Sequence, residues 1–411
     1  MSATSSQPAL FLGLYGDAPD RAPARWSLAK VDRVDLGRGD TNRAEHASIG
    51  GAEVLVVALP DGRMSSQHAR LSRLGGAWIL EDLGSKNGTW LGAKRLTRHQ
   101  LVDGDAFVIG HTVLVFRDHG GEAADHEGMP DALAPGLGTL SPALAAHFAP
   151  LAQVIATGVP LELAGESGTG KELVARMIHE ASGRRGKFVA VHCSALSPAG
   201  VESFRSAEGG TLFVDEIGEL SAAGQASLVA MIQDGAKAAD VRVIVANKTR
   251  TDVGERLGAV FVELPPLRTR REDLGHLITT LLARLAPSRT FSADAVAAIY
   301  AYAWPSNLRE LERALAAALA VARDRIELSH LPPALRGLAP TAIAPPRSET
   351  IPYTKELPDD DESLKQLLVD TIARHNGNLA AVSRELGKDR TQIRRWMKRF
   401  GLSRSDEDDV R

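Results

Sequence analysis

The segment Gly165–Lys171, GESGTGK, limits the possible folds of this chain more than any other stretch of its 411 residues. It follows the apolar run PLELA and precedes ELVARMIHEA, in which apolar residues recur at helical spacing. Glycines in such a loop let backbone N–H groups surround phosphates, and Lys171 can reach the β- and γ-phosphate oxygens at the helix N-terminus. The segment predicts a P-loop between a strand and a helix of an α/β domain on a parallel sheet.

A second motif strengthens this prediction. Gly209–Glu216, GGTLFVDE, is an apolar run that ends in two carboxylates. In a nucleotide site Asp215 would hold Mg²⁺ through water, and Glu216 would polarise the attacking water. The alternative is that the two acidic residues only cap a helix. Glu172 stands where a P-loop usually has Ser or Thr, which weakens the first motif when it is taken alone.

Two segments, residues 119–139 and 337–362, predict linkers because they are rich in Pro, Gly and acidic residues and lack a hydrophobic period. They divide the chain into three blocks. Residues 28–118 contain β-branched and alternating runs separated by DG, GG and NG turns, which predicts an all-β sandwich. Residues 140–336 alternate strand-like and helix-like runs and end in an Ala-rich helical region. Residues 363–403 are short, helical and basic.

The first block carries short polar motifs at its turns: Gly37-Arg38, Ser65–His68, Asp82–Thr89 and Asp103–Asp105. With Trp90 after NGT, they resemble the forkhead-associated (FHA) domain along its whole length. The resemblance implies a phosphothreonine site, since a dianionic phosphate needs a guanidinium together with hydroxyl, amide and backbone donors. The residues that it implies are Arg38, Ser65, Ser66, Lys86 and Asn87, with His68 supporting the loop of Ser65.

Two of these positions depart from the FHA pattern. Ser66 stands where the family often has Arg or Asn, and Lys86 stands where it often has Thr. Lys86 keeps a cation near the phosphate, so we expect binding to persist with a different peptide preference. The alternative is that all these motifs are only hairpin residues, because NG and DG are common turn formers.

Further runs in the middle block carry a second resemblance. GESGTGKE, GGTLFVDEIGEL, VRVIVAN, ELPPLRTRREDL and WPSNLRELERAL together resemble the AAA+ domain of sigma-54-dependent activators over residues 140–336. In that family Glu is usual at position 172, which removes the objection above. The resemblance implies ATP and Mg²⁺ as cofactors. It assigns nucleotide binding to Gly165, Glu166, Ser167, Gly168, Thr169, Gly170, Lys171, Glu172 and Asp215, metal binding to Asp215, and catalysis to Glu216 and to Arg309 as the second sensor.

The residues that would complete hydrolysis match the family less well. Arg250 and Arg256 correspond only weakly to its trans-acting arginines, and the first sensor is Asn247 or, as a poorer match, Lys248. An arginine supplied in trans contributes about 10³–10⁵ in rate. We therefore expect ATP binding with weak ATPase activity.

Two insertions of that family are missing from this sequence. The GAFTGA loop, which touches sigma-54 in the family, has no counterpart where the chain passes from Ser203 to Gly209, and a second pore-facing loop is reduced to Gly235–Ala239. A five-residue gap cannot project a hairpin, because each residue spans at most about 3.3–3.6 Å. We therefore expect that the chain does not activate sigma-54 polymerase by the family's usual mechanism.

The last block has the spacing of three short helices and resembles the Fis-type helix-turn-helix that closes many sigma-54 activators. From Ser363 to Arg404 it holds 10 Lys and Arg against 3 Asp and Glu, a local charge of +7 that suits double-stranded DNA. On the third helix Ile393, Trp396, Met397 and Phe400 are expected in the core. The predicted DNA-binding residues are Arg390, Thr391, Gln392, Arg394, Arg395 and Lys398. The alternative is a merely solvated basic helix. Because one such unit has a small interface, we expect at least a dimer on a palindromic site.

The composition also predicts the cellular compartment. Cys193 is the only cysteine, the N-terminus has no basic region before an apolar core, and no apolar run reaches about 20 residues. These features predict a soluble, cytoplasmic protein without membrane contact.

The leading hypothesis is a transcription regulator that binds DNA, ATP and a phosphothreonine-containing protein. The alternatives are an active AAA+ ATPase that remodels sigma-54 RNA polymerase, which makes polymerase or a sigma factor a further candidate partner, and a phosphothreonine-binding scaffold with a vestigial ATPase domain.

Overall fold

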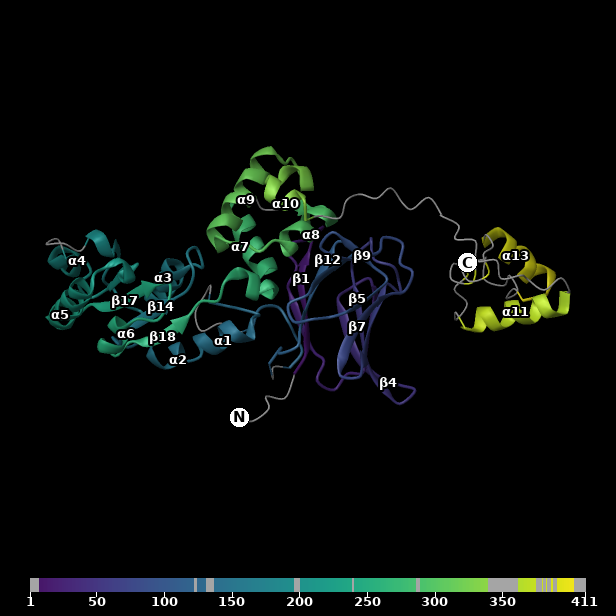
Figure 1. The fold of residues 1–411 in the computed structure, drawn as a ribbon, viewed down its shortest axis with the longest axis horizontal. Helices are drawn as coiled ribbons and strands as arrows, with labels where there is room; N and C mark the ends of the chain where they lie inside the picture. Colours follow the sequence, from purple (N-terminus) through teal and green to yellow (C-terminus); the bar gives the residue numbers. More distant parts are fainter. Residues whose placement is uncertain are drawn as a thin grey trace. The chain divides into compact units, whose positions relative to one another are not determined.

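The computed structural model describes residues 7–121, 124–130, 137–195, 200–238, 240–285, 289–338, 361–374, 379, 382, 386 and 390–402 (Figure 1). They fall into two compact units, Met1–Thr341 and Ala342–Arg411. None of the helices in these ranges has the length and the apolar content that crossing a membrane requires.

The N-terminal part of the first unit is a sandwich of two sheets (Figure 1). In the first sheet the strands follow the order β13-β2-β1-β12-β11-β8-β9, and all neighbours pair antiparallel. Its strands are β1 (Ala9–Tyr15), β2 (Ala24–Ser27), β8 (Thr89–Leu91), β9 (Lys94–Leu96), β11 (Ala106–Ile109), β12 (Thr112–Arg117) and β13 (His126–Glu127).

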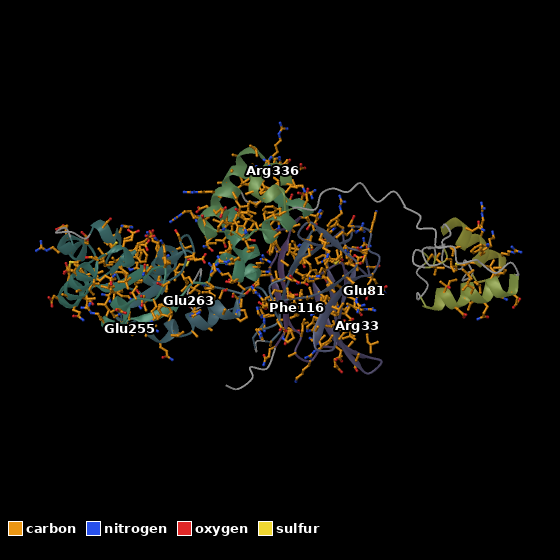
Figure 2. The ribbon with its side chains drawn as sticks, in the orientation of Figure 1. Arg33, Glu81, Phe116, Glu255, Glu263 and Arg336 are labelled. Atoms are coloured by element: carbon orange, nitrogen blue, oxygen red, sulfur yellow. The ribbon has the colours of Figure 1, made fainter. Side chains whose placement is uncertain are left out.

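The second sheet has the order β10-β7-β6-β3-β5-β4, in which only β3 and β5 run parallel. Its strands are β3 (Arg33–Arg38), β4 (Arg43–Ile49), β5 (Ala52–Leu59), β6 (Ala69–Leu74), β7 (Ala77–Asp82) and β10 (Arg98–Gln100). Large apolar side chains such as Trp26, Trp78 and Phe107 fill the space between the sheets. Figure 2 shows Phe116 inside the sandwich, whereas Arg33 and Glu81 belong to strands of the second sheet.

The predicted range of this block, residues 28–118, is shorter than the sandwich. Strands β1 and β2 precede residue 28, and β13 lies in the segment 119–139 that the sequence predicts as a linker. The reason is visible in β1, which is buried at all seven positions. A strand covered on both faces has no alternation of apolar and polar residues, so the pattern of a half-buried strand is absent from it.

The next part of the unit is an α/β domain on a parallel sheet with the order β15-β16-β17-β14-β18, as predicted. The strands are β14 (Leu161–Ala164), β15 (Phe188–His192), β16 (Thr211–Asp215), β17 (Arg242–Asn247) and β18 (Val260–Glu263). The helices are α1 (Pro142–Phe148), α2 (Leu151–Val154), α3 (Lys171–Ala181), η1 (Cys193–Ala195), α4 (Gly200–Ser206), η2 (Ile217–Glu219), α5 (Ala222–Ala238) and α6 (Asp252–Arg256).

A helical lid follows this domain in the chain. Its elements are η3 (Leu267–Thr269), η4 (Arg271–Asp273), α7 (Leu274–Leu285), β19 (Thr290–Phe291), α8 (Ala293–Ala301), α9 (Asn307–Val321), β20 (Arg325–Ile326), η5 (Leu328–His330) and α10 (Pro333–Arg336). The short strands β19 and β20 pair in parallel. Among the nine positions of α8, all from Ala295 to Tyr300 are buried, which shows that this helix is covered on every side.

The lid packs on the outer face of the first sheet of the sandwich (Figure 1). One apolar cluster joins residues of β1, β11 and β12, such as Phe11, Val108 and Val115, to lid residues such as Ile278 and Ile299. The side chains on the opposite face of the same strands, among them Leu10, Leu12 and Leu114, fill the sandwich core. The sandwich and the lid therefore share a continuous apolar core.

Two glycines allow the close approach of helices α7 and α8 to strand β1. A Cβ atom at Gly275 would lie 1.7 Å from the carbonyl oxygen of Gly13, and one at Gly13 would lie 2.7 Å from the hydroxyl of Tyr300. Both positions therefore require glycine for this packing. A backbone hydrogen bond from the N–H of Phe291 to the carbonyl of Gly16, 2.6 Å long, joins β19 to the end of β1.

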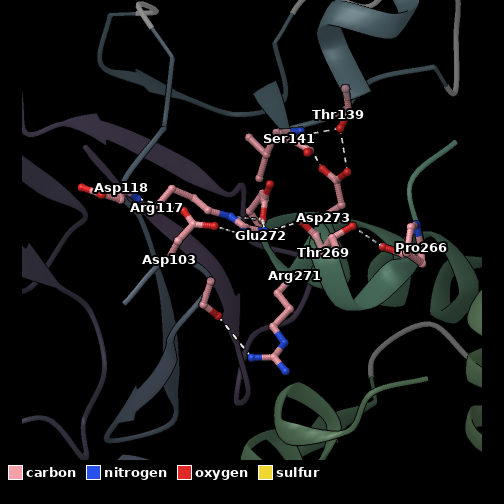
Figure 3. A network of polar contacts seen from close by, with 12 residues as sticks. Asp103, Arg117, Asp118, Thr139, Ser141, Pro266, Thr269, Arg271, Glu272 and Asp273 are labelled. Atoms are coloured by element: carbon pink, nitrogen blue, oxygen red, sulfur yellow. Dashed lines mark hydrogen bonds and ion pairs between the residues drawn. The ribbon is translucent and has the colours of Figure 1, made fainter. Parts of the chain in front are cut away.

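A buried polar network lies beside this apolar contact (Figure 3). The guanidinium of Arg117, at the end of β12, donates from Nε to Glu272 Oε2 at 2.9 Å and from Nη1 to Asp103 at 2.9 Å. Arg271 donates to the carbonyl of Gly104 at 3.2 Å. Burial raises the pKa of Glu272, and the positive charge of Arg117 opposes that shift. The network ties the sandwich to η4 by charge as well as by apolar contact.

The second unit contains α11 (Asp361–Arg374) and α13 (Arg390–Arg399). Its core is formed by Leu368, Val382, Leu386 and Ile393. Trp396, Met397 and Phe400 pack against this cluster, so the predicted core face of the third helix is confirmed. Most of the predicted middle helix lies outside the described residues.

We predict that Arg117→Ala lowers the free energy of unfolding of the first unit by about 3–5 kcal/mol, since it leaves the buried carboxylate of Glu272 without its partner. Arg43→Ala removes the exposed pair with Glu45 and is the control, for which a loss below about 1 kcal/mol is expected. Urea unfolding followed by tryptophan fluorescence measures both. Equal losses would show that the buried pair does not hold the lid to the sandwich.

Candidate functional site

The glycine-rich loop lies at the carboxyl end of β14 and leads directly into α3, as the sequence predicts. Gly168 has φ 78, and a Cβ atom there would lie 2.2 Å from the carbonyl oxygen of Ser306 in the lid. The N–H of Leu308 donates to the carbonyl of Gly168 at 2.9 Å. The lid therefore lies in direct contact with the loop, and only glycine fits at position 168.

The ammonium group of Lys171 points back into the loop. Its Nζ donates to the carbonyl of Gly165 at 2.8 Å and to the carbonyl of Glu166 at 3.2 Å. Burial lowers the pKa of Lys171, and the carboxylates of Asp215 and Glu216 oppose that shift. The predicted phosphate-binding cation thus hydrogen-bonds to the loop itself and is influenced electrostatically by the two predicted carboxylates.

Asp215 ends β16 and Glu216 follows it, at the same edge of the parallel sheet as the loop. Glu216 has φ 56, and its N–H donates to Oδ1 of Asp215 at 2.9 Å. Asn247, the predicted first sensor, ends β17, the strand between β16 and β14. Its carbonyl accepts from the N–H of Gly165 at 3.1 Å. The carboxyl ends of parallel strands are where α/β sheets bind ligands.

Several lid side chains hydrogen-bond to the loop, and only Arg309 among them belongs to the predicted set. Arg309, the predicted second sensor, donates to Ser167 Oγ at 3.2 Å. Arg268 makes a bidentate pair with Glu166 at 2.6 and 2.8 Å, and this exposed pair lowers the pKa of Glu166. Asn307, which is buried, donates to the carbonyl of Ser167 at 3.1 Å and accepts from the N–H of Leu267 at 2.7 Å.

A cavity of about 400 Å³ opens beside the loop. Thr169, Gly170 and Leu173 line it from the loop and α3, and Leu277 and Leu308 line it from the lid. The walls are mostly apolar, with Arg270, Asp273 and His276 as polar groups. A cavity of this kind can bury a flat aromatic base next to a phosphate-binding loop.

Two further predicted residues lie on the surface after β17. Arg250 makes an ion pair of 3.4 Å with Glu255 and stacks over the ring of Phe261 at 5.1 Å. Arg256 is the last residue of α6, and its carbonyl accepts from Gln233. Glu172, on the first turn of α3, pairs with Arg176 at 2.9 Å.

The predicted phosphothreonine residues come together on two adjoining loops of the sandwich. Arg38 ends β3, and its N–H donates to the carbonyl of Ser65 at 2.9 Å. Ser65 Oγ accepts from the N–H of Lys86 at 3.1 Å. Asn87 donates to the carbonyl of Arg63 at 2.6 Å. Ser66 and the side chains of Arg38 and Lys86 are exposed, so hydroxyl and cationic donors are available to an anion at this end of the sandwich.

His68 supports these loops from below, as the sequence predicts. The N–H of Ser65 donates to its Nδ1 at 3.1 Å, so Nε2 carries the proton and donates to the carbonyl of Gly88 at 3.2 Å. Burial lowers the pKa of His68, while the hydrogen bond to Gly88 opposes that shift. The neutral imidazole thus connects the loop of Ser65 to the loop of Asn87.

The loop of Asn87 is built on Asp82. Burial opposes ionisation of Asp82, but hydrogen bonds from Ser85 and Thr89, each shorter than 3 Å, lower its pKa overall. Trp90 closes the loop, since its Nε1 donates to the carbonyl of Asn87 at 3.0 Å. The indole ring packs against the core that the sandwich shares with the lid. The sequence marked Trp90 as a family feature but held no signal for this contact.

In the second unit the predicted DNA-binding residues belong to α13. Arg395 and Lys398 are exposed, and Gln392 is half-buried. The side chains of Arg390, Thr391 and Arg394 lie outside the described part of the structure. Two exposed cations on a helix next to a small apolar core are compatible with contact to phosphates.

Comparison with known families agrees with these three regions. Residues 47–110 match the FHA domain, and residues 138–257 match the sigma-54 interaction domain. Residues 268–346 match the AAA+ ATPase lid domain, and residues 365–400 match the Fis family of bacterial regulatory proteins.

Several regulators are similar to this chain over about three fifths of its length. The hydrogenase transcriptional regulatory protein HoxA of Cupriavidus necator is 32% identical over 300 residues, which are 61% of this chain and 62% of that protein. The anaerobic nitric oxide reductase transcription regulator NorR of Citrobacter koseri is 34% identical over 58% of each chain. The chain thus spans less than two thirds of the length of these relatives. The crystal structure of NtrX from Brucella abortus in complex with ATP is 25% identical, with a TM-score of 0.42, and covers 65% of this chain and 69% of that one.

A P-loop α/β domain with a helical lid, an FHA sandwich and a helix-turn-helix define a multidomain AAA+ regulator. The chain carries a sigma-54 interaction domain with an AAA+ lid, together with an FHA domain in its N-terminal part and a Fis-type domain in its C-terminal part. All three resemblances found in the sequence are confirmed.

We predict that His68 titrates below 6.5, its ordinary value, because burial disfavours the imidazolium form. The unfolded chain then binds a proton at pH values where the folded chain does not. The contribution of His68 to the free energy of unfolding is therefore complete above pH 6.5, and it is lost as the pH falls through the lower pKa of the folded state. NMR titration of histidine-labelled protein measures the pKa, with His68→Gln to assign the signal. A value at or above 6.5 would contradict this prediction.

Proposed function

We propose that this chain is a DNA-binding transcription regulator that docks on a phosphothreonine-containing protein and binds ATP with Mg²⁺. The observation that supports it best is that the phosphothreonine loop and the P-loop both contact the lid. Trp90 packs on the shared core from one side, and Asn307 and Arg309 contact the P-loop from the other.

The polar residues at the loop end of the sandwich support phosphothreonine binding. Arg38 offers a guanidinium for a bidentate contact, and Ser65, Ser66, Lys86 and Asn87 offer the further donors that a dianion needs. The neutral His68 and the ionised Asp82 hold these donors in place through hydrogen bonds within the two loops.

The edge of the parallel sheet supports ATP binding. Residues Gly165–Lys171 would surround the phosphates, and the cavity of about 400 Å³ beside Thr169 and Gly170 fits an adenine base. Asp215 suits Mg²⁺ because its carboxylate is a hard oxygen ligand and stands at the end of β16, on the sheet edge where the loop lies. The bound ion would neutralise phosphate charge, and Glu216 would orient water.

Two observations support slow turnover. Arg250 is engaged in the pair with Glu255, and the residues from Ser203 to Gly209 form the end of α4 and a tight turn. Residues 200–238 are all described and contain no projecting hairpin between α4 and β16. Without a loop that changes its contact with the sigma factor between nucleotide states, hydrolysis has no means of acting on it.

ATP is therefore proposed as a structural or regulatory input rather than as a source of work on the polymerase. The third helix of the second unit would bind a palindromic DNA site as a dimer, with Arg395 and Lys398 near phosphates. An active AAA+ ATPase that remodels sigma-54 polymerase is the second candidate function, favoured by the complete P-loop and the Asp215-Glu216 pair.

We predict that Arg38→Ala weakens binding of a phosphothreonine peptide by about 1.5–3 kcal/mol, because it removes a charge-assisted bidentate contact. Fluorescence anisotropy with the best binder from a phosphothreonine peptide library measures the loss. Arg98→Ala, an exposed arginine on β10, is the matched control and should change nothing. Equal affinity for the phosphorylated and unphosphorylated peptide would refute phosphothreonine docking.

We predict that the purified chain gives no ATP-dependent increase in open complexes on a sigma-54 promoter, because the loop that would grip the sigma factor is absent between α4 and β16. The wild type and Lys171→Ala should behave alike in this assay. Stimulation by ATP that disappears in Lys171→Ala would establish the second candidate function instead.

A further inference from the structure

Three potential metal ligands that the proposed function does not use lie together near Glu216. They are His192 at the end of β15, Cys193 in η1 and Glu219 in η2. One ligand atom from each lies within 4.8 Å of the other two. Residues from three elements, β15, η1 and η2, thus present a nitrogen, a sulfur and an oxygen to one another.

The imidazole of His192 is held in the orientation that a metal ligand needs. Its Nδ1 is 2.9 Å from Ser194 Oγ, and its Nε2 is 3.7 Å from Oε2 of Glu219. Metal-binding histidines commonly use one ring nitrogen for the ion and the other for a hydrogen bond that fixes the ring. The pair with Glu219 and the contact with Ser194 divide the two nitrogens in this way.

Cys193 supplies the softest donor. It is the only cysteine of the chain and is buried, and its Sγ donates to the carbonyl of Glu216 at 3.1 Å. Burial raises the pKa of Cys193, and the nearby carboxylate of Glu219 adds to that shift. The thiol donates its proton in this hydrogen bond, and a bound cation would displace that proton.

We propose that His192, Cys193 and Glu219 bind one Zn²⁺ ion, with water as the fourth ligand. Thiolate, imidazole and carboxylate are the ligands that zinc takes in proteins, at about 2.0–2.3 Å and in tetrahedral arrangement. Mg²⁺ prefers oxygen ligands alone, so the donor set separates this site from the proposed Mg²⁺ position at Asp215. About half of the His192 and Glu219 side chains is exposed, which leaves them free to close on an ion.

A second cluster in the described part of the chain shows the contrast. Asp17, Asp61 and His111 also place ligand atoms within 4.8 Å of one another. There, however, Arg325 lies 3.1 Å from His111 Nε2, and Asp61 already accepts from Thr112 Oγ1 and from the N–H of His111. A cationic side chain and saturated oxygens disfavour a metal ion at that position. Among the described residues that contact His192, Cys193 and Glu219, none is a cation.

Zinc at this site would also act on the neighbouring Glu216. Loss of the thiol proton removes the donor that the Glu216 carbonyl now accepts from, and Glu216 already has a left-handed backbone. The ion would in exchange cross-link η1 to η2. The site therefore offers a means of changing the backbone beside the proposed nucleotide position without occupying it.

The test is a zinc titration of the full, tag-free chain, freed of metal by a chelator, against a chromophoric zinc chelator. One Zn²⁺ per chain is expected. His192→Asn and Cys193→Ser should each weaken binding by at least about 100-fold, since even loss of an outer-shell partner costs about 10–100-fold. Asp17→Asn, from the second cluster, is the control and should bind like the wild type.

Co²⁺ provides an independent readout, because a thiolate ligand gives an intense charge-transfer absorption that Cys193→Ser must abolish. Circular dichroism checks that each variant is folded. His192 and Glu219 are half-exposed, so His192→Asn and Glu219→Gln keep the test valid even if Cys193→Ser does not fold. Absence of stoichiometric binding, or binding that His192→Asn and Glu219→Gln leave unchanged, would overturn the proposal. Neither readout depends on ATP, so failure here leaves the proposed function untouched.

Discussion

The contact between the lid and the outer face of the first sheet is the constraint on which the rest of the first unit depends. Strands β1, β11 and β12 are apolar on both faces because one face fills the sandwich and the other fills the shared core. Exposure of the outer face would leave Phe11, Val108 and Val115 in water at about 25 cal/mol per Å² of apolar surface. The FHA domain is therefore an integral part of the lid assembly, joined to it by core packing and by the buried pair of Arg117 with Glu272.

The same lid shapes the candidate nucleotide site. Asn307 and Arg309 come from the first turn of α9, and Arg268 comes from η3, yet all three bind the P-loop. Gly168 is pressed against Ser306, so the loop conformation depends on where the lid lies. A phosphoprotein on the loop of Asn87 and a nucleotide on the P-loop would thus both bind next to the lid, which packs against the sandwich and contacts the P-loop. Coupling between two such sites is reciprocal when it exists.

Much of the site was predictable from the sequence, because its parts are local motifs. The strand–loop–helix order around Gly165–Lys171 and the run ending in Asp215-Glu216 place those residues at one sheet edge whatever the rest of the chain does. Asn307 and Arg268 escaped prediction as ligands of the P-loop, since they reach it across more than a hundred residues. The cluster of His192, Cys193 and Glu219 escaped for the same reason: β15 and η2 become neighbours only when β15 pairs with β16.

The sequence by itself determined the three domain types, the positions of their short motifs and the absence of the GAFTGA loop, because each rests on residues close together in the chain. It predicted a free linker at residues 119–139, whereas β13 joins the first sheet and Thr139 donates to the buried Asp273 at 2.6 Å. Tertiary structure alone decided that the sandwich and the lid share one core. An apolar strand such as Ala9–Tyr15 shows that both of its faces must be covered, but its sequence does not specify by what. The partner of this strand is decided by complementary shape, above all by the close approach of Gly275 to the backbone of Gly13. These two residues come together only in the folded chain.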